Sequence, residues 1–281
     1  MMIARRAIVA LAVIAAAAPA AGAQQWQTVD VARQLHDTGM VTVKVTYAAG
    51  KLTVRGAPAP YLYSMQMRYD SERGQPLSSY DAATRSLRVG MSGKSGRWSG
   101  RGGDDAGDMQ LALSRSAAMD LTMDLGATDA DLDLSGMALR TLEIRTGASE
   151  TTVRFDSVSR RPMERMDLNL GAAAVHARHL ANAGVQKLNV RGGVGEVDLD
   201  LTGVWSRDMD VQLDVALGGV TIVVPRDVGI RIEADKVFGS FDFGGLKKQG
   251  NAWLSDGFDA ATYKVRIRSA TVLGTLTVER R

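Results

Sequence analysis

A pattern of alternating apolar residues, each copy centred on a glycine, recurs along most of the chain. The glycines are 21, 24, 22, 25, 21 and 35 residues apart, at Gly126, Gly147, Gly171, Gly193, Gly218, Gly239 and Gly274. Repeats of about 20 to 25 residues built on alternating strands are typical of a β-solenoid, in which each repeat forms one rung. Residues 108–281 are therefore predicted to form a parallel β-helix-like solenoid of about seven rungs.

Shorter strands are predicted before the repeats. Val41, Val43 and Val45 alternate with polar residues, as in a strand with one buried face. The segment 48–50 is predicted as a turn between two strands. The expected strands cover residues 27–35, 40–47, 51–55, 61–69, 75–80 and 86–91. No long amphipathic helix is evident, so the expected fold class is all-β, with an antiparallel N-terminal β region followed by the solenoid.

A glycine-rich stretch, residues 90–107, separates the two regions. Ordering so many glycines costs much conformational entropy, so a linker or loop is predicted there. Trp98 lies among three cations, Lys94, Arg97 and Arg101. This group could contact an anionic polymer or membrane headgroups, but three charges and one aromatic ring make a weak patch. A solvated loop is the favoured interpretation.

The first 23 residues predict an export signal. Arg5 and Arg6 precede an apolar run over residues 7–18, and residues 21–23 match a cleavage site of the A-x-A type. The apolar run is shorter than the roughly 20 residues that a membrane-spanning helix needs. The mature chain is expected to begin at Gln24, to have no stable membrane anchor and to be periplasmic or secreted.

The composition argues against several kinds of site and partner. The chain contains no cysteine, which excludes disulfides, thiol nucleophiles, thiolate metal ligands and a lipid-modified N-terminal cysteine. Without Arg5 and Arg6, 32 basic residues face 31 acidic ones. Nucleic-acid partners are not expected, because there is no basic excess and aromatic residues for base stacking are few.

Charged residues recur at outward positions of the predicted rungs. Asp133, Arg154, Arg178 and Asp200 follow the first four glycines by seven residues, and Asp129, Glu150 and Glu196 follow three of them by three residues. One interpretation is a groove that binds a cation or a glycan amine, or that performs lyase or glycosidase chemistry. The other is a solvated surface with Asp–Arg pairs between rungs. The second is favoured, because a glycosidase needs one carboxyl with a raised pKa, and solvated strands lack the burial that raises it.

Two metal-binding patterns fail. Residues 192–199 are similar to a calcium-binding nonapeptide, but Val197 occupies the aspartate position and Asp198 is turned to the opposite face. His176 and His179 are three residues apart, which would place them on opposite faces of a strand, and His36 is distant in sequence. No third ligand is evident, so no catalytic, cofactor-binding or metal residues are predicted, and no cofactor is expected.

A family resemblance rests on several of these segments. Residues 41–54, a strand, an aromatic residue, a small-glycine turn and a second strand, resemble the opening of the toast-rack domain. Residues 218–225, 239–241 and 273–278 are similar to cell-wall-active antibiotics response proteins and adhesin-like solenoid domains. The resemblance implies a toast-rack-like region over residues 24–107 and an adhesin-like solenoid over residues 108–281, with a link to envelope stress in some members and no catalytic residues to transfer.

Three classes of function fit these features. The favoured one is an exported, non-enzymatic cell-envelope module that binds or scaffolds an envelope protein or a cell-wall polymer. The alternatives are a β-helix polysaccharide lyase or hydrolase, and a structural protein that self-associates end to end. An enzyme needs a cleft in which reactive groups converge. A self-assembling solenoid instead leaves an apolar rung uncovered at one end.

Overall fold

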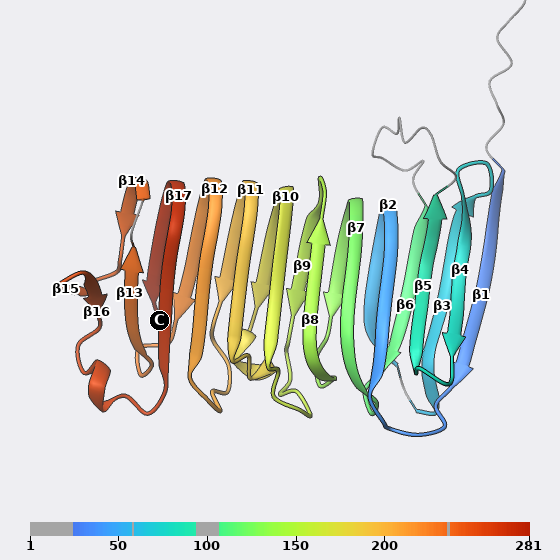
Figure 1. The fold of residues 1–281 in the computed structure, drawn as a ribbon, viewed down its shortest axis with the longest axis horizontal. Coiled ribbons are helices and arrows are strands. Elements are labelled where there is room, and N and C mark those ends of the chain that lie inside the picture. The colour runs from blue at the N-terminus through green and yellow to red at the C-terminus, as the bar shows by residue number, and fades with distance from the viewer. Residues whose placement is uncertain (1–24, 58, 94–106, 235–236) are drawn as a thin grey trace, which may run out of the picture.

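The computed structural model describes residues 25–57, 59–93, 107–234 and 237–281. These residues form an elongated stack of strands, all linked in one mixed sheet of 17 strands (Figure 1). The helices in the described part are two 3-10 turns, η1 (Leu180–Ala183) and η2 (Phe258–Ala260). The all-β prediction is confirmed. The described ranges contain no helix with the length and hydrophobicity needed to cross a membrane, and the predicted signal segment, residues 1–23, lies outside them.

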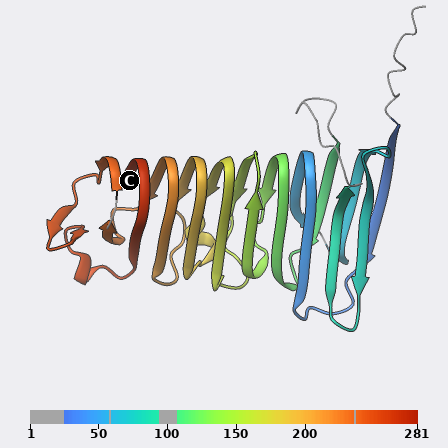
Figure 2. The ribbon, with the colours of Figure 1, turned by 45° about the horizontal axis from the view of Figure 1, so that its top comes forward.

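Long parallel strands form the middle of the stack. They are β2 (Val41–Ala57), β7 (Ala118–Asp133), β10 (Arg165–Arg178), β11 (Lys187–Asp200), β12 (Met209–Val224) and β17 (Lys264–Arg280). Between β7 and β10, one rung is split into β8 (Ala138–Thr146) and β9 (Glu150–Arg154). The strands fold over at one edge of the stack (Figure 2). Each rung thus has a first half and a second half, and we call their outward surfaces the first face and the second face.

The N-terminal strands continue this stack. β5 (Ser86–Gly93) pairs in parallel with the first half of β2, and β6 (Asp108–Ser114) with its second half. Antiparallel strands follow on the outside, namely β4 (Gly74–Asp81) on β5, β3 (Tyr61–Asp70) on β6, and β1 (Trp26–Gln34) on β3. Because β2 also pairs with β7, the two predicted regions share one sheet. Their division into domains at residue 107 stays a prediction.

Two local predictions in this region are wrong. The segment 48–50, predicted as a turn, lies within the continuous strand β2, between the half that pairs with β5 and the half that pairs with β6. Residues 90–93, predicted as part of the linker, belong to β5. A Cβ at Gly90 would lie 2.0 Å from the carbonyl oxygen of Thr46, so this glycine permits close strand packing rather than a loop. The rest of the predicted linker, residues 94–106 with Trp98 and its three cations, lies outside the described residues.

The C-terminal strands do not follow sequence order. β17 lies between β12 and the last rung, which consists of β13 (Gly229–Ala234) and β14 (Val237–Asp242). Gly274 therefore lies between Gly218 and Gly239, whereas the sequence order places it last. The interval before Gly274 includes a hairpin, β15 (Lys247–Gln249) and β16 (Ala252–Leu254), of which β16 pairs with β13.

The register of the glycines also differs from the predicted frame. Gly218 lies opposite Gly195 and not opposite Gly193. The residues that align with Gly218 in the first four repeats therefore lie two positions after the glycines that the sequence analysis aligned with it. Because two residues is one full strand period, inward and outward positions are unchanged. In the aligned register, the column that contains Gly218 holds only small residues: Thr128, Ser149, Ala173, Gly195, Gly218, Gly274 and Gly239.

The core fills the space between the two halves of the rungs. One buried column runs through seven rungs of the second half: Val54, Leu132, Val153, Ala177, Leu199, Ile222 and Val278. Burying apolar side chains of this kind stabilises the fold by about 1.5 to 3 kcal/mol for each large residue. The alternating outward residues are thereby held on a rigid scaffold, which is what positions the candidate site.

Candidate functional site

The second face is acidic between β7 and β11. Its outward side chains there include seven carboxylates and two arginines: Asp129, Asp131, Asp133, Glu150, Glu196, Asp198 and Asp200, with Arg154 and Arg178. Every charged residue that the repeat analysis singled out lies on this face. The rungs therefore bring residues that are about 20 positions apart in sequence into neighbouring places.

The predicted Asp–Arg pairing between rungs is present at Arg154, but with a different aspartate. Arg154 contacts the carboxylate of Asp131 at 2.7 Å, although Asp133 is its neighbour in register. Asp133 instead accepts a hydrogen bond of 3.1 Å from the backbone N–H of Ser135. Partial burial raises the pKa of Asp133, but the hydrogen bonds from Ser135 and the charges of Arg154 and Arg115 together leave this pKa below its ordinary value. Asp133 is therefore unsuited to act as a general acid.

Both histidines of the second half are paired with carboxylates. His176 Nδ1 lies 2.8 Å from Asp198, and His179 lies 2.9 Å from Asp156 and 3.9 Å from Asp200. Asp198 and Asp200 share one face of β11, so the expectation of opposite faces is wrong. The reason is that β10 ends at residue 178 and His179 has a φ of 55°.

No metal centre forms within the described ranges, because no group of three His, Asp or Glu side chains there is arranged to hold an ion. His36 is exposed between β1 and β2, far along the stack from β10. In the calcium-like segment, Val197 is buried and Asp198 faces outward.

The first face differs from the second because most of its charges bond to one another. Asp124 contacts Lys44 at 2.8 Å and Arg145 at 2.9 Å, and Arg145 also contacts Glu143. Asp120 accepts hydrogen bonds from Arg140 and Thr141. The hydrogen bond from Arg140 is the main reason that the pKa of Asp120 lies below its ordinary value.

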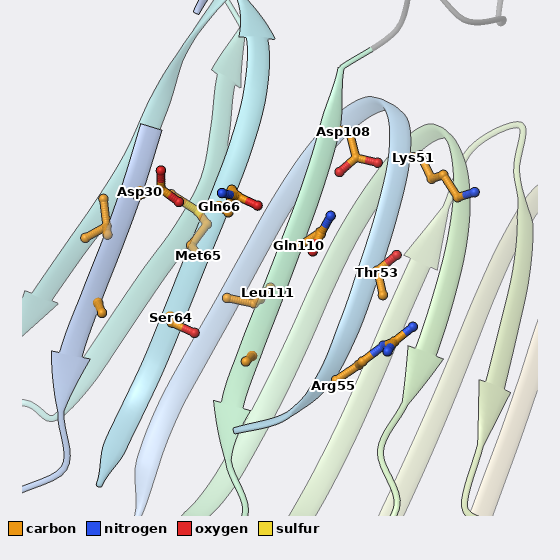
Figure 3. A pocket seen from close by; sticks show the side chains of 13 residues that line it. Asp30, Lys51, Thr53, Arg55, Ser64, Met65, Gln66, Asp108, Gln110 and Leu111 are labelled. Atoms are coloured by element: carbon orange, nitrogen blue, oxygen red, sulfur yellow. The ribbon is translucent and has the colours of Figure 1, made fainter. Parts of the chain in front are cut away.

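At the N-terminal end of the stack the second face is hollowed. A groove of about 720 Å³ crosses four strands, β2, β6, β3 and β1 (Figure 3). Its floor is low because small residues, Ala32, Ser64 and Ala112, lie side by side in register. Polar and charged side chains surround this floor: Lys51, Thr53 and Arg55 from β2, Asp108 and Gln110 from β6, Gln66 from β3 and Asp30 from β1.

The polar groups of the groove have no partners among the described residues. Eight side chains form no hydrogen bond or ion pair with another described residue: Asp30, Lys51, Thr53, Arg55, Ser64, Gln66, Asp108 and Gln110. Near one end, the hydroxyl of the buried Tyr47 also lacks a partner within the described ranges. Burial, and then the charge of Asp108, raise the pKa of Tyr47, so this hydroxyl remains a protonated donor. The eight side chains that line the groove are thus free to bind a ligand, whereas the Tyr47 hydroxyl is buried beneath the surface.

The groove was not predicted from the sequence. Its lining residues come from four strands whose spatial order, β1, β3, β6 and β2, differs from their order in the chain. No periodic signal joins Asp30, Gln66, Gln110 and Thr53, although the structure places them in one row across the sheet.

Solved structures with a similar arrangement have low sequence identity to this chain. A candidate cell adhesion protein from Clostridium sporogenes is 16% identical, with 92% of this chain and 100% of that one covered and a TM-score of 0.49. A candidate adhesin from Bacteroides fragilis is 8% identical, with coverage of 90% and 97% and a TM-score of 0.41. A search of curated proteins gave no match.

Family models match nearly the whole chain. Residues 177–278 match the C-terminal region of LiaF, described as cell wall-active antibiotics response. Residues 20–176 match the N-terminal domain of toast_rack, DUF2154. The two matches meet within β10. The match to the N-terminal domain of toast_rack spans more than half of the chain. The chain therefore belongs to the family defined by the N-terminal domain of toast_rack.

Proposed function

We propose that the mature chain is exported and acts in the cell envelope as a non-enzymatic binding module, with the second face and its groove as the contact surface. One observation carries the proposal: eight polar side chains line the groove without a partner among the described residues. On the first face, by contrast, Lys44, Asp124 and Arg145, and also Asp120 and Arg140, bond to one another. Unpaired polar groups on rigid strands can bond to a ligand without first breaking internal bonds. The family match to cell wall-active antibiotics response proteins supports a place in the envelope.

The enzyme alternative has one pair of residues in its favour. Asp129 and Glu150 lie opposite each other on neighbouring rungs, which places them about 5 Å apart at the backbone. Both side chains are exposed, whereas glycosidases keep one of their two carboxyls in an environment that holds it protonated. We expect no cleavage of cell-wall or capsular polysaccharide, with or without divalent metal. Cleavage that disappears in Asp129→Asn or Asp198→Asn would establish the enzyme alternative.

Self-association also has a specific observation in its favour. Phe241 of β14 occupies an inward column opposite Leu276 of β17, yet 43% of its surface is exposed at the C-terminal end of the stack. Such an uncovered position can pair with another chain. Sedimentation velocity at increasing protein concentration tests this, and concentration-dependent association that Phe241→Ser abolishes would support the alternative.

The binding proposal is tested by co-sedimentation with an insoluble envelope fraction of the source organism. The mature chain is compared with a groove variant, Lys51→Ser with Gln66→Ala and Gln110→Ala. A first-face variant, Lys187→Ser with Asn189→Ala and Gln212→Ala, serves as the matched control. We expect the groove variant to lose most of the retention and the control to keep it. Equal retention of all three folded proteins would contradict the proposal.

A further inference from the structure

We infer that the groove binds a short zwitterionic peptide in an extended conformation. This inference rests on the proposed function, because it names the ligand class of the same surface. It is argued from the distribution of charge in the groove, the chemistry of its centre and the kinds of side chain that line it.

Apart from Asp108, which lies beside Lys51, the charges of the groove differ in sign between its two walls. Lys51 and Arg55 come from β2, on one wall, and Asp30 comes from β1, on the other (Figure 3). The two walls are three strand spacings apart, about 14 Å. Arg55 lies opposite Ala112, whereas Lys51 lies opposite Asp108, so Arg55 is the cation without a carboxylate beside it on β6. A carboxylate at Arg55 and an ammonium group at Asp30 would satisfy both walls.

The distance between the walls matches a short peptide. An extended chain advances about 3.3 Å per residue, so four residues span about 13 Å. The guanidinium group binds a carboxylate through two parallel hydrogen bonds, which fixes the orientation of the terminus. A peptide of this length would place its C-terminus at β2 and its N-terminus at β1.

The centre of the groove presents amide groups. Gln66 and Gln110 lie directly opposite each other on β3 and β6. A primary amide donates and accepts hydrogen bonds at the same time, as does the peptide backbone. Only small side chains project from the floor between the walls. The main chain of a bound peptide can therefore come close to the sheet. The strands below are anchored by the buried Met65 and Leu111, which holds both amides on a rigid base.

The lining argues against other ligand classes. No aromatic ring is among the described residues that line the groove, and sugar rings pack their C–H faces on such rings. Two carboxylates in the groove would repel nucleic acids and other polyanions. Two cations, in turn, would repel polyamines. A ligand with one charge of each sign is the best electrostatic match.

The test is a titration of the isotope-labelled mature chain with tetra-alanine, followed by NMR. Signals of the side-chain amides are assigned with Gln66→Ala and Gln110→Ala. We expect the signals of both amides to shift on titration. Arg55→Gln should weaken binding at least about tenfold, because the variant loses the charge-assisted hydrogen bonds to the carboxylate. Lys187→Gln on the first face is the matched control and should leave the affinity unchanged.

Two further ligands make the result decisive. N-acetylated, C-amidated tetra-alanine should bind at least about tenfold more weakly, because both charges are removed. Equal binding of the blocked peptide, binding of an N-acetylglucosamine tetramer instead of the peptide, or the absence of any shift would overturn the inference. If the groove variant still loses envelope retention in that case, the proposed function stands and only the ligand class fails. Unchanged retention of the groove variant would instead overturn the proposed function itself.

Discussion

Gly195 of β11 lies opposite Gly218 of β12, and a Cβ at Gly218 would lie 1.8 Å from the carbonyl oxygen of Gly195. Gly218 also has a φ of 144°, which side chains rarely adopt. Gly218→Ala should therefore force the two rungs apart and lower the free energy of unfolding by about 3 kcal/mol or more. Urea denaturation followed by circular dichroism measures the change.

The neighbouring residue provides the control. A Cβ at Gly219 would meet no atom within 4 Å. Gly219→Ala should change the free energy of unfolding by no more than about 0.5 kcal/mol. If the two variants lost the same stability, the close approach of the rungs at Gly218 would not be what excludes a larger residue from that position.

Inward and outward residues of one strand should respond differently to substitution. Val197 and Ile222 are buried, so Val197→Asp or Ile222→Asp would bury an unpaired carboxylate at a cost of several kcal/mol. Asp198→Asn and Thr221→Asn change outward side chains and should alter stability by less than about 0.5 kcal/mol. Thermal unfolding of the four variants checks this, and outward substitutions as damaging as the inward ones would mean that the strand register is wrong.

The Asp120–Arg140 pair should make stability depend on pH. The folded pKa of Asp120 lies below its ordinary value, mainly because Arg140 donates hydrogen bonds to it. The stabilisation is therefore present above the unfolded pKa, near 3.9, and is lost as the pH falls through the lower folded value. Asp120→Asn should cost about 1 kcal/mol at pH 7, and less at pH 3.

Urea denaturation at both pH values tests this pair. The control is Asp214→Asn, since Asp214 is exposed on the same face and forms no ion pair or hydrogen bond with its described neighbours. If both variants lost the same stability at pH 7, the Asp120–Arg140 pair would make no net contribution.

Export should remove the N-terminal segment. Residues 21–23 follow a short alanine-rich run and match a signal-peptidase site. N-terminal sequencing of the protein recovered outside the cytoplasm should begin at Gln24. Recovery of chains that begin at Met1 from that fraction would contradict the predicted processing.

The strands and their buried faces could be predicted because alternation is a local signal. Val41, Val43 and Val45 show it within five residues, and all three are buried. The register of one rung could not be predicted, since the segment 192–195 contains three glycines and the sequence does not say which one faces Gly218. The position of β17 could not be predicted either, because it depends on pairing between distant strands. The groove is a product of the same long-range order.

Site-specific photocrosslinking in living cells tests the central claim most directly. A photoreactive residue replaces Gln110 in the groove or, as the control, Gln212 on the first face. If the second face is the binding surface, irradiation should join an envelope component to the Gln110 variant and not to the Gln212 variant. Crosslinks from Gln212 alone, or no crosslink from Gln110 while the exported protein is folded, would contradict the account.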